Sequence, residues 1–159
     1  SDNYKVYVSH RYFLCKRKEE IRMVKIIAGE KGTGKTKRMI RMANDDVKSL
    51  NGHVVFIDRN KRHIYDLNHD LRFMNMEEFP VKTAEEFFGF LCGMISNDYD
   101  IEKVYIDGLL KIAGIKEDDL VMFVPRLNDL AKQYDFNVIF TLSGDQTKLP
   151  NEISPYFIE

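Results

Sequence analysis

The chain of 159 residues is 44% hydrophobic and 31% charged, a balance typical of one globular domain with a substantial core. No run of about eighteen apolar residues occurs and no signal segment opens the chain, so we expect a cytoplasmic protein without a membrane span. The two cysteines, Cys15 and Cys92, fit neither a disulfide framework nor the spacing of zinc ligands.

Charge is distributed unevenly along the chain, although the net charge is only −1. Residues 1–42 contain twelve Lys or Arg and four Asp or Glu, which leaves a net charge of −9 on residues 43–159. This asymmetry has two interpretations: solvated surface charges, or a basic face that attracts phosphates or an acidic partner. The near-zero net charge, without a recognisable RNA- or DNA-binding module, argues against nucleic acid as the partner.

The first 22 residues are basic and contain scattered aromatic residues, and we interpret residues 1–22 as an N-terminal extension. Alternation of Tyr4, Val6 and Val8 allows one edge strand there. Beyond residue 22, strand-like and helix-like patterns alternate. Strands are predicted at 23–29, 53–60, 71–76, 101–108 and 137–145, with a short edge strand at 156–158. Helices are predicted at 39–50, 83–96 and 120–134.

Two local signals support the helix boundaries. Asn51-Gly52 follows the first helical pattern and should end it. Thr83 and Glu86 stand in capping-box register at the start of the second helix. Because strands separated by helices imply right-handed crossovers, the predicted fold class is α/β, a three-layer sandwich with a mainly parallel sheet over residues 23–159.

The glycine-rich stretch after the first predicted strand is the most informative motif. Gly29-Glu30-Lys31-Gly32-Thr33-Gly34-Lys35-Thr36 fits the Walker A pattern GxxxxGK(S/T). Glycines let the backbone turn tightly and aim several N–H groups at phosphate oxygens, and the following helix adds its positive end. Lys35 can reach the β- and γ-phosphates, and the Thr36 hydroxyl can bind Mg²⁺. All eight residues are therefore candidates for binding ATP or GTP with Mg²⁺.

The strand at 101–108 carries a second candidate. Its apolar run ends at Asp107, as in the Walker B strand of P-loop proteins, where the carboxylate holds Mg²⁺. With Thr36, Asp107 forms the predicted metal site. A strand that ends in aspartate also occurs where the residue only begins a turn, so this assignment depends on the Walker A loop.

With these motifs the chain resembles the P-loop NTPase superfamily, and its strand sequence resembles the RecA-like branch. The resemblance implies that the last strand, ending near Ser143, inserts between the strands that end at Ala28 and Asp107. A polar residue at the tip of that strand senses the γ-phosphate in RecA-like proteins, and Ser143 matches it by count. Turn formation around Gly144 is the alternative interpretation of this serine.

The glutamate that activates water in RecA-like ATPases is missing from both of its usual places. Gly108 follows Asp107 where many of these enzymes have glutamate, and Asn60 stands where RecA itself has one, after "FIDR". Asp58 is the nearest substitute carboxylate. The candidate catalytic residues are therefore Lys35, Asp58 and Ser143.

The short chain also looks like small stand-alone bacterial P-loop proteins that are sometimes labelled as twitching-motility (pilus-retraction) ATPases. This resemblance implies an ATP·Mg²⁺-binding protein, either a slow ATPase or a nucleotide-gated switch that acts with a protein partner or by self-association. One alternative is a small-molecule (nucleoside-type) kinase, because a strand, P-loop, helix and strand followed by the "VYIDG" strand resemble the core of thymidine kinases. Those enzymes, however, have a glutamate where this chain has Gly108, and their CxxC pairs are absent. A pseudo-ATPase that binds nucleotide as a structural ligand is the third reading.

Overall fold

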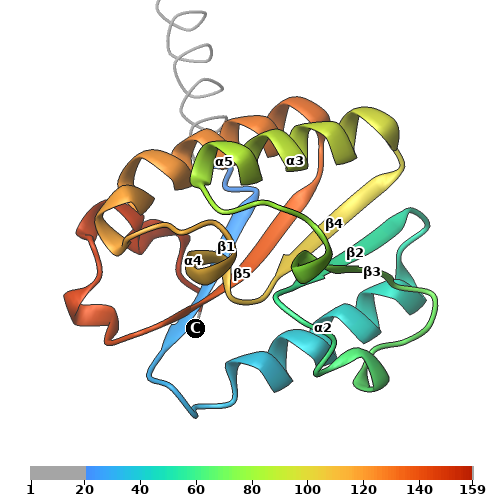
Figure 1. The fold of residues 1–159 in the computed structure, drawn as a ribbon, viewed down its shortest axis with the longest axis horizontal. Helices are drawn as coiled ribbons and strands as arrows, with labels where there is room; N and C mark the ends of the chain where they lie inside the picture. Colours follow the sequence, from blue (N-terminus) through green and yellow to red (C-terminus); the bar gives the residue numbers. More distant parts are fainter. Residues whose placement is uncertain (1–20, 159) are drawn as a thin grey trace, which may run out of the picture.

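The computed structural model describes residues 21–158, which form an α/β structure on one five-stranded sheet (Figure 1). The strands are β1 (Val24–Gly29), β2 (His53–Asp58), β3 (Arg72–Asn75), β4 (Ile101–Ile106) and β5 (Asn137–Ser143). All neighbouring strands are parallel, in the order β1-β5-β4-β2-β3. In this order β5 lies between β1 and β4, the placement that the resemblance implied.

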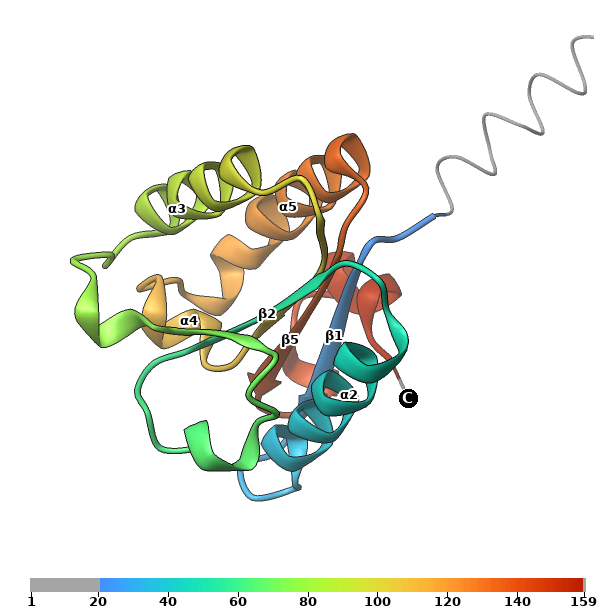
Figure 2. The same ribbon diagram turned by 90° about the vertical axis from the view of Figure 1, so that its right-hand side faces the viewer.

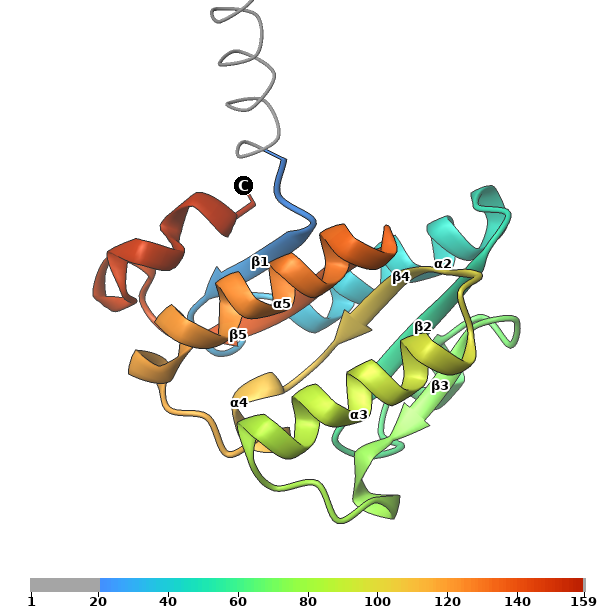
Figure 3. The ribbon, with the colours of Figure 1, turned by 90° about the horizontal axis from the view of Figure 1, so that it is seen from above.

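Helices cover both faces of this sheet, which gives the predicted three layers (Figures 1 and 2). Helix α2 (Lys35–Ser49) lies against one face, and α3 (Ala84–Asn97) and α5 (Leu120–Tyr134) lie side by side on the other (Figure 3). A short helix, α4 (Leu109–Ile112), follows β4. Short 3-10 turns are η1 (Ile64–Asp66), η2 (Met76–Glu78), η3 (Glu117–Asp119), η4 (Gln146–Lys148) and η5 (Asn151–Tyr156). In this part of the chain, no helix combines the length and hydropathy that crossing a membrane requires.

Two hydrophobic cores form because successive side chains of a strand point to opposite faces of the sheet. The core beneath α3 and α5 includes Ile26, Val55, Ile57, Val104, Ile106 and Phe140. The core beneath α2 includes Ile27, Val54, Phe56, Tyr105 and Ile139, with Met39, Ile40 and Ala43 from the helix. Because both faces of the sheet are buried, the strands are continuous apolar runs in the sequence and not alternating ones.

The start of α3 shows how local chemistry sets an element boundary. The Thr83 hydroxyl oxygen accepts a hydrogen bond of 3.1 Å from the backbone N–H of Glu86. The same hydroxyl donates to the Glu86 carboxylate at 3.0 Å. The capping-box residues thus satisfy one of the amides that a helix leaves unpaired at its start. At the other boundary signal, α2 ends at Ser49, just before Asn51-Gly52.

The C-terminal tail differs from its prediction. Instead of an edge strand at 156–158, a single parallel bridge joins Phe157 to Ile26, and the N–H of Ile158 donates to the Ile26 carbonyl at 3.0 Å. The preceding residues turn as η5, and Pro155 within it has no N–H to give to a ladder. The tail therefore contacts the outer edge of β1 without extending the sheet. The other predicted edge strand, at Tyr4–Val8, lies outside the described residues.

Candidate functional site

The eight residues predicted to bind phosphate, Gly29–Thr36, form the turn from the end of β1 into the first residues of α2. Gly32 and Gly34 have φ angles of 86° and 83°, a conformation that residues with a Cβ rarely adopt. The Glu30 carbonyl accepts hydrogen bonds from the amide and the hydroxyl of Thr33, at 3.3 and 2.8 Å. The first turn of α2 has no acidic residue and no side-chain cap, so its amides are available to an external anion.

Lys35 lies across this loop. Its ammonium donates to the carbonyls of Gly29 and Glu30, both at 2.8 Å. An ammonium has three N–H donors, so these two bonds hold the side chain in place and leave one donor for a ligand. A phosphate oxygen in the loop would meet a positive charge that is already positioned.

Asp107 directly follows β4 and is held by two hydroxyl groups from different elements. Its Oδ2 accepts a hydrogen bond from Thr36 at 3.1 Å, and its Oδ1 accepts one from Thr141 at 2.8 Å. The fold therefore brings together the two residues predicted to bind metal. Thr141 was not predicted, although a signal existed: it follows Ile139 by two positions on β5 and so faces α2 and the loop.

Asp58 ends β2 and is the buried carboxylate of the site. It is 4% exposed, and its Oδ1 accepts a hydrogen bond of 2.7 Å from the backbone N–H of Arg59. Its Oδ2 is buried and has no hydrogen-bond partner among residues 21–158. Burial raises the pKa of Asp58, and the nearby Asp107 carboxylate raises it further. An unpaired buried carboxylate oxygen is costly, and a bound cation or a protonated ligand would relieve it.

The tip of β5 places Ser143 beside Gly29, and its exposed side chain lines the same cleft. Ser143 is thus close to the loop, whereas Thr141 is the β5 residue that contacts Asp107. Asn60 and Gly108 occupy the two positions where a water-activating glutamate was expected by resemblance. Asn60 accepts a hydrogen bond from the N–H of Arg62 in the turn after β2. Gly108 has a φ of 80° and lies against the side chain of Arg59.

These residues surround one cleft of about 710 Å³ at the carboxyl ends of the strands. The lining includes six basic residues, Lys31, Lys35, Lys37, Arg59, Arg62 and Lys111. Its only acidic residues, within the described part of the chain, are Asp58 and Asp107. This excess of positive charge favours a polyanionic ligand, and the two carboxylates lie where a cation bound to that ligand could be held.

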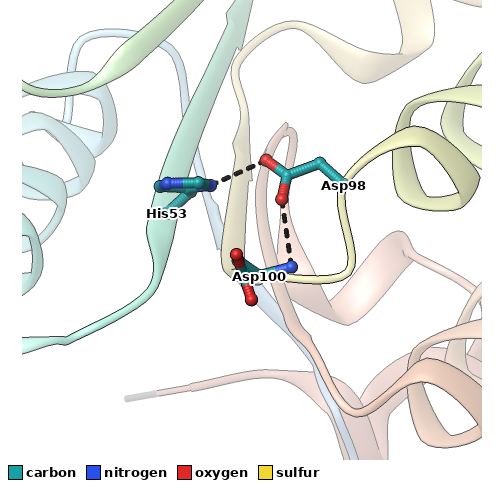
Figure 4. Close-up of side chains that lie close together, drawn as sticks. All are labelled: His53, Asp98 and Asp100. Carbon is teal, nitrogen blue, oxygen red and sulfur yellow. Dashed lines mark hydrogen bonds and ion pairs between the residues drawn. The ribbon is translucent and has the colours of Figure 1, made fainter.

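A second group of ionisable residues lies at the opposite end of the sheet, where β2 and β4 begin (Figure 4). His53 Nδ1 lies 2.7 Å from Asp98 Oδ2, and the backbone N–H of Asp100 donates to Asp98 Oδ1 at 3.0 Å. The three side chains could approach one cation. However, the Arg72 guanidinium already contacts the same oxygen of Asp98. We therefore interpret the group as an ion-pair network that joins β2, β3 and the turn before β4.

No protein-family model matches the chain, and no curated protein matches its sequence. The inference of function therefore depends on the residues that surround the cleft.

Proposed function

We propose that the chain binds ATP or GTP with Mg²⁺ and acts as a slow ATPase or a nucleotide-gated switch. The observation that carries this proposal is the double hydrogen bond of Asp107 to Thr36 and Thr141, next to the Lys35 ammonium and the glycine loop. The loop, the ammonium of Lys35 and the oxygen atoms of Asp107, Thr36 and Thr141 thus lie in one cleft, a combination that suits a phosphate group with Mg²⁺. The strand order β1-β5-β4 supports a RecA-like P-loop protein.

The donor atoms in the cleft fit Mg²⁺, which prefers carboxylate and hydroxyl oxygens and keeps several of its waters. Thr36 and Asp107 would hold it, and Asp58, another residue of the cleft lining, has a buried oxygen, Oδ2, that is unpaired within residues 21–158. When bound, the metal would neutralise negative charge on the phosphates. The Thr141 hydroxyl would orient the Asp107 carboxylate, as residues behind a metal ligand commonly do.

Lys35 and Asp58 would have separate roles in hydrolysis. Lys35 would stabilise negative charge on the phosphates from a fixed position. Asp58 is the carboxylate that could orient the attacking water, because neither Asn60 nor Gly108 offers one. Its raised pKa suits a group that accepts a proton, but its burial limits its access to water. We therefore expect slow turnover unless a protein partner or a second copy of the chain adds a group to the site.

A small-molecule kinase is the second candidate function, and the lining of the cleft supports it. Arg62, His63 and Lys111 also line the cleft, and an acceptor could bind there. A pseudo-ATPase that binds nucleotide structurally would need the same loop and metal position but no water-orienting group. Formation of ADP and release of phosphate, each measured with and without candidate acceptors, separate the three. ADP with an equal amount of phosphate indicates an ATPase, acceptor-dependent ADP without phosphate indicates a kinase, and neither product indicates a pseudo-ATPase.

The test of the proposal is a nucleotide-dependent shift in melting temperature. ATP or GTP with Mg²⁺ should stabilise the protein, because a ligand that binds only the folded state always does. Lys35→Ala should remove most of this shift and leave the ligand-free protein folded. Lys132→Ala, which removes an exposed charge on α5, is the matched control and should keep the shift. An undiminished shift in Lys35→Ala would contradict the proposed site.

A further inference from the structure

Arg59 and Gly108 are in direct contact although they come from different strands. A Cβ added to Gly108 would lie 2.9 Å from both Cγ and Cδ of Arg59 and 3.1 Å from its Nε. The stem of the arginine therefore lies across the backbone of the residue that follows Asp107. Together with the φ of 80°, this contact means that a side chain at position 108 would displace Arg59.

Arg59 directly follows β2, where the chain bends. The N–H of Arg59 donates to Oδ1 of its buried neighbour, Asp58, at 2.7 Å. The Arg59 side chain then lines the same cleft as Lys35 and Asp107. Within residues 21–158 its guanidinium has no hydrogen bond or salt bridge, although its charge opposes the rise that burial causes in the pKa of the adjacent Asp58, so its N–H donors are available to a ligand.

The order of the strands places Arg59 at a particular end of a bound polyphosphate. Along the carboxyl edge of the sheet, the glycine loop follows β1, Asp107 follows β4, and Arg59 follows β2. A phosphate chain held between the loop and Asp107 would point its terminal group toward β2. That group would therefore approach Arg59.

We propose that Arg59 binds the terminal phosphate of the nucleotide, as a guanidinium supplied by the same chain. This inference rests on the proposed nucleotide site and adds a residue that distinguishes a triphosphate from a diphosphate. A guanidinium binds phosphate oxygens bidentately and keeps its charge at every physiological pH. Next to the metal position it would favour the negative charge that builds on the transferred phosphoryl group, which partly compensates for the absence of a carboxylate at Gly108.

The test compares the dissociation constants of a non-hydrolysable ATP analogue and of ADP, each with Mg²⁺, by calorimetry. Arg59→Ala should weaken the analogue on the order of 10- to 100-fold, because a hydrogen-bonded charged contact is lost, and change ADP by less than about twofold. Arg59→Lys should weaken binding of the analogue less than Arg59→Ala does, because lysine keeps the charge but cannot bind two phosphate oxygens in the planar geometry of a guanidinium. Lys61→Ala is the matched control: it removes a charge from the same turn, but its ammonium pairs with Glu78 at 3.6 Å and should affect neither ligand.

Gly108→Ala provides an independent variant that leaves the arginine in the sequence. By pushing Arg59 aside it should reproduce the loss of triphosphate preference, and melting curves of both variants without ligand would verify that they fold. An unchanged ratio of the two dissociation constants in Arg59→Ala would overturn the role of Arg59 and leave the nucleotide site standing. If Arg59→Ala weakens binding of both ligands equally, Arg59 contacts a part of the nucleotide that ATP and ADP share, and the proposed role is wrong. A wild-type chain that binds neither ligand would overturn both proposals.

Discussion

Thr141 and Asp107 are joined by a hydrogen bond of 2.8 Å between neighbouring strands, and this bond fixes one oxygen of the carboxylate that faces the glycine loop. The other oxygen is held by Thr36 at the start of α2. The carboxylate is thereby oriented before any ligand arrives. Pre-oriented ligands lower the cost of binding a metal, since less freedom is lost on binding.

Thr141→Val should weaken Mg²⁺-dependent nucleotide binding by about tenfold, equivalent to roughly 1.4 kcal/mol, because the carboxylate loses one of its two supports. The free energy of unfolding should fall by about 1 kcal/mol with the lost hydrogen bond. Isothermal titration with and without Mg²⁺ measures the first effect. Thr83→Val, which removes a helix-capping hydroxyl that does not line the cleft, should cost a similar ~1 kcal/mol of stability but leave binding unchanged. Equal binding by both variants would show that Thr141 does not support the site.

Asp107→Asn should weaken nucleotide binding in Mg²⁺ more than binding in chelator. The asparagine amide has nearly the same shape as the carboxylate and can still accept the hydrogen bond from the Thr141 hydroxyl, but it lacks the negative charge that attracts a hard cation. Affinities measured in the two buffers provide the comparison, with Thr141→Val as a weaker variant of the same kind. If both buffers lose affinity equally, Asp107 acts on the nucleotide or on the fold and not through the metal.

Asp58→Asn should stabilise the ligand-free protein, on the order of 1 kcal/mol, when metal is chelated. Burial and the Asp107 charge disfavour the ionised carboxylate, and a neutral amide removes both penalties. Chemical denaturation in chelator measures the gain. Asp70→Asn makes the same charge change at an exposed position in the turn before β3 and should have little effect. A loss of stability in Asp58→Asn would mean that its Oδ2 has a stabilising partner.

The ion-pair network at the start of β2 and β4 should make stability depend on pH. Partial burial opposes ionisation of Asp98, but hydrogen bonds from His53 and the Asp100 backbone and the charges of His53 and Arg72 outweigh it, so the pKa of Asp98 is lowered. The ionised group therefore stabilises the fold above its ordinary pKa of 3.8, and this contribution is lost as pH falls through the lowered value.

Asp98→Asn should accordingly lower the melting temperature at neutral pH. The free energy of unfolding should fall by less than about 1 kcal/mol, because the network is near the surface. The difference from wild type should shrink as the pH falls below about 4. Asp100→Asn, whose side chain is exposed and takes part through its backbone, is the control. A difference that grows in acid would reverse the assigned direction of the shift.

The elements that could be predicted from the sequence are those whose signal is local. The apolar strands, the glycine loop and the capping residues of α3 depend on spacing within a few residues. The order of the strands could be predicted only from the resemblance to the RecA-like branch, because no local sequence pattern indicates that β5 lies between β1 and β4. The tail was predicted less well because Tyr156–Ile158 alternates like a strand, while Pro155 beside it allows only one bridge to β1.

The candidate site divides in the same way. The loop residues and Asp107 follow from a motif, whereas the contact of Arg59 with Gly108 joins two turns that are almost fifty positions apart and leaves no periodic signal. Thr141 could be predicted only in part. The alternation of side chains along β5 indicates on which face of the sheet it lies, but its bond to Asp107 depends on the register that pairs Phe140 with Ile106. The structure was needed for each of these relationships.

The last prediction concerns the rate of ATP hydrolysis by the purified chain. In the proposed site, Lys35 and the bound metal would stabilise charge on the transferred phosphoryl group, but Gly108 and Asn60 supply no carboxylate to orient the attacking water. General-base help is commonly worth about 10²–10⁴-fold, so starting from a median enzyme near ~10 s⁻¹ we expect roughly 10⁻³–10⁻¹ s⁻¹ or slower. Steady-state phosphate release at saturating ATP and Mg²⁺ measures this rate, and Lys35→Ala controls for contamination. Turnover of several per second that disappears in Lys35→Ala would mean that a competent base is present, and Asp58→Ala would then test whether that base is Asp58.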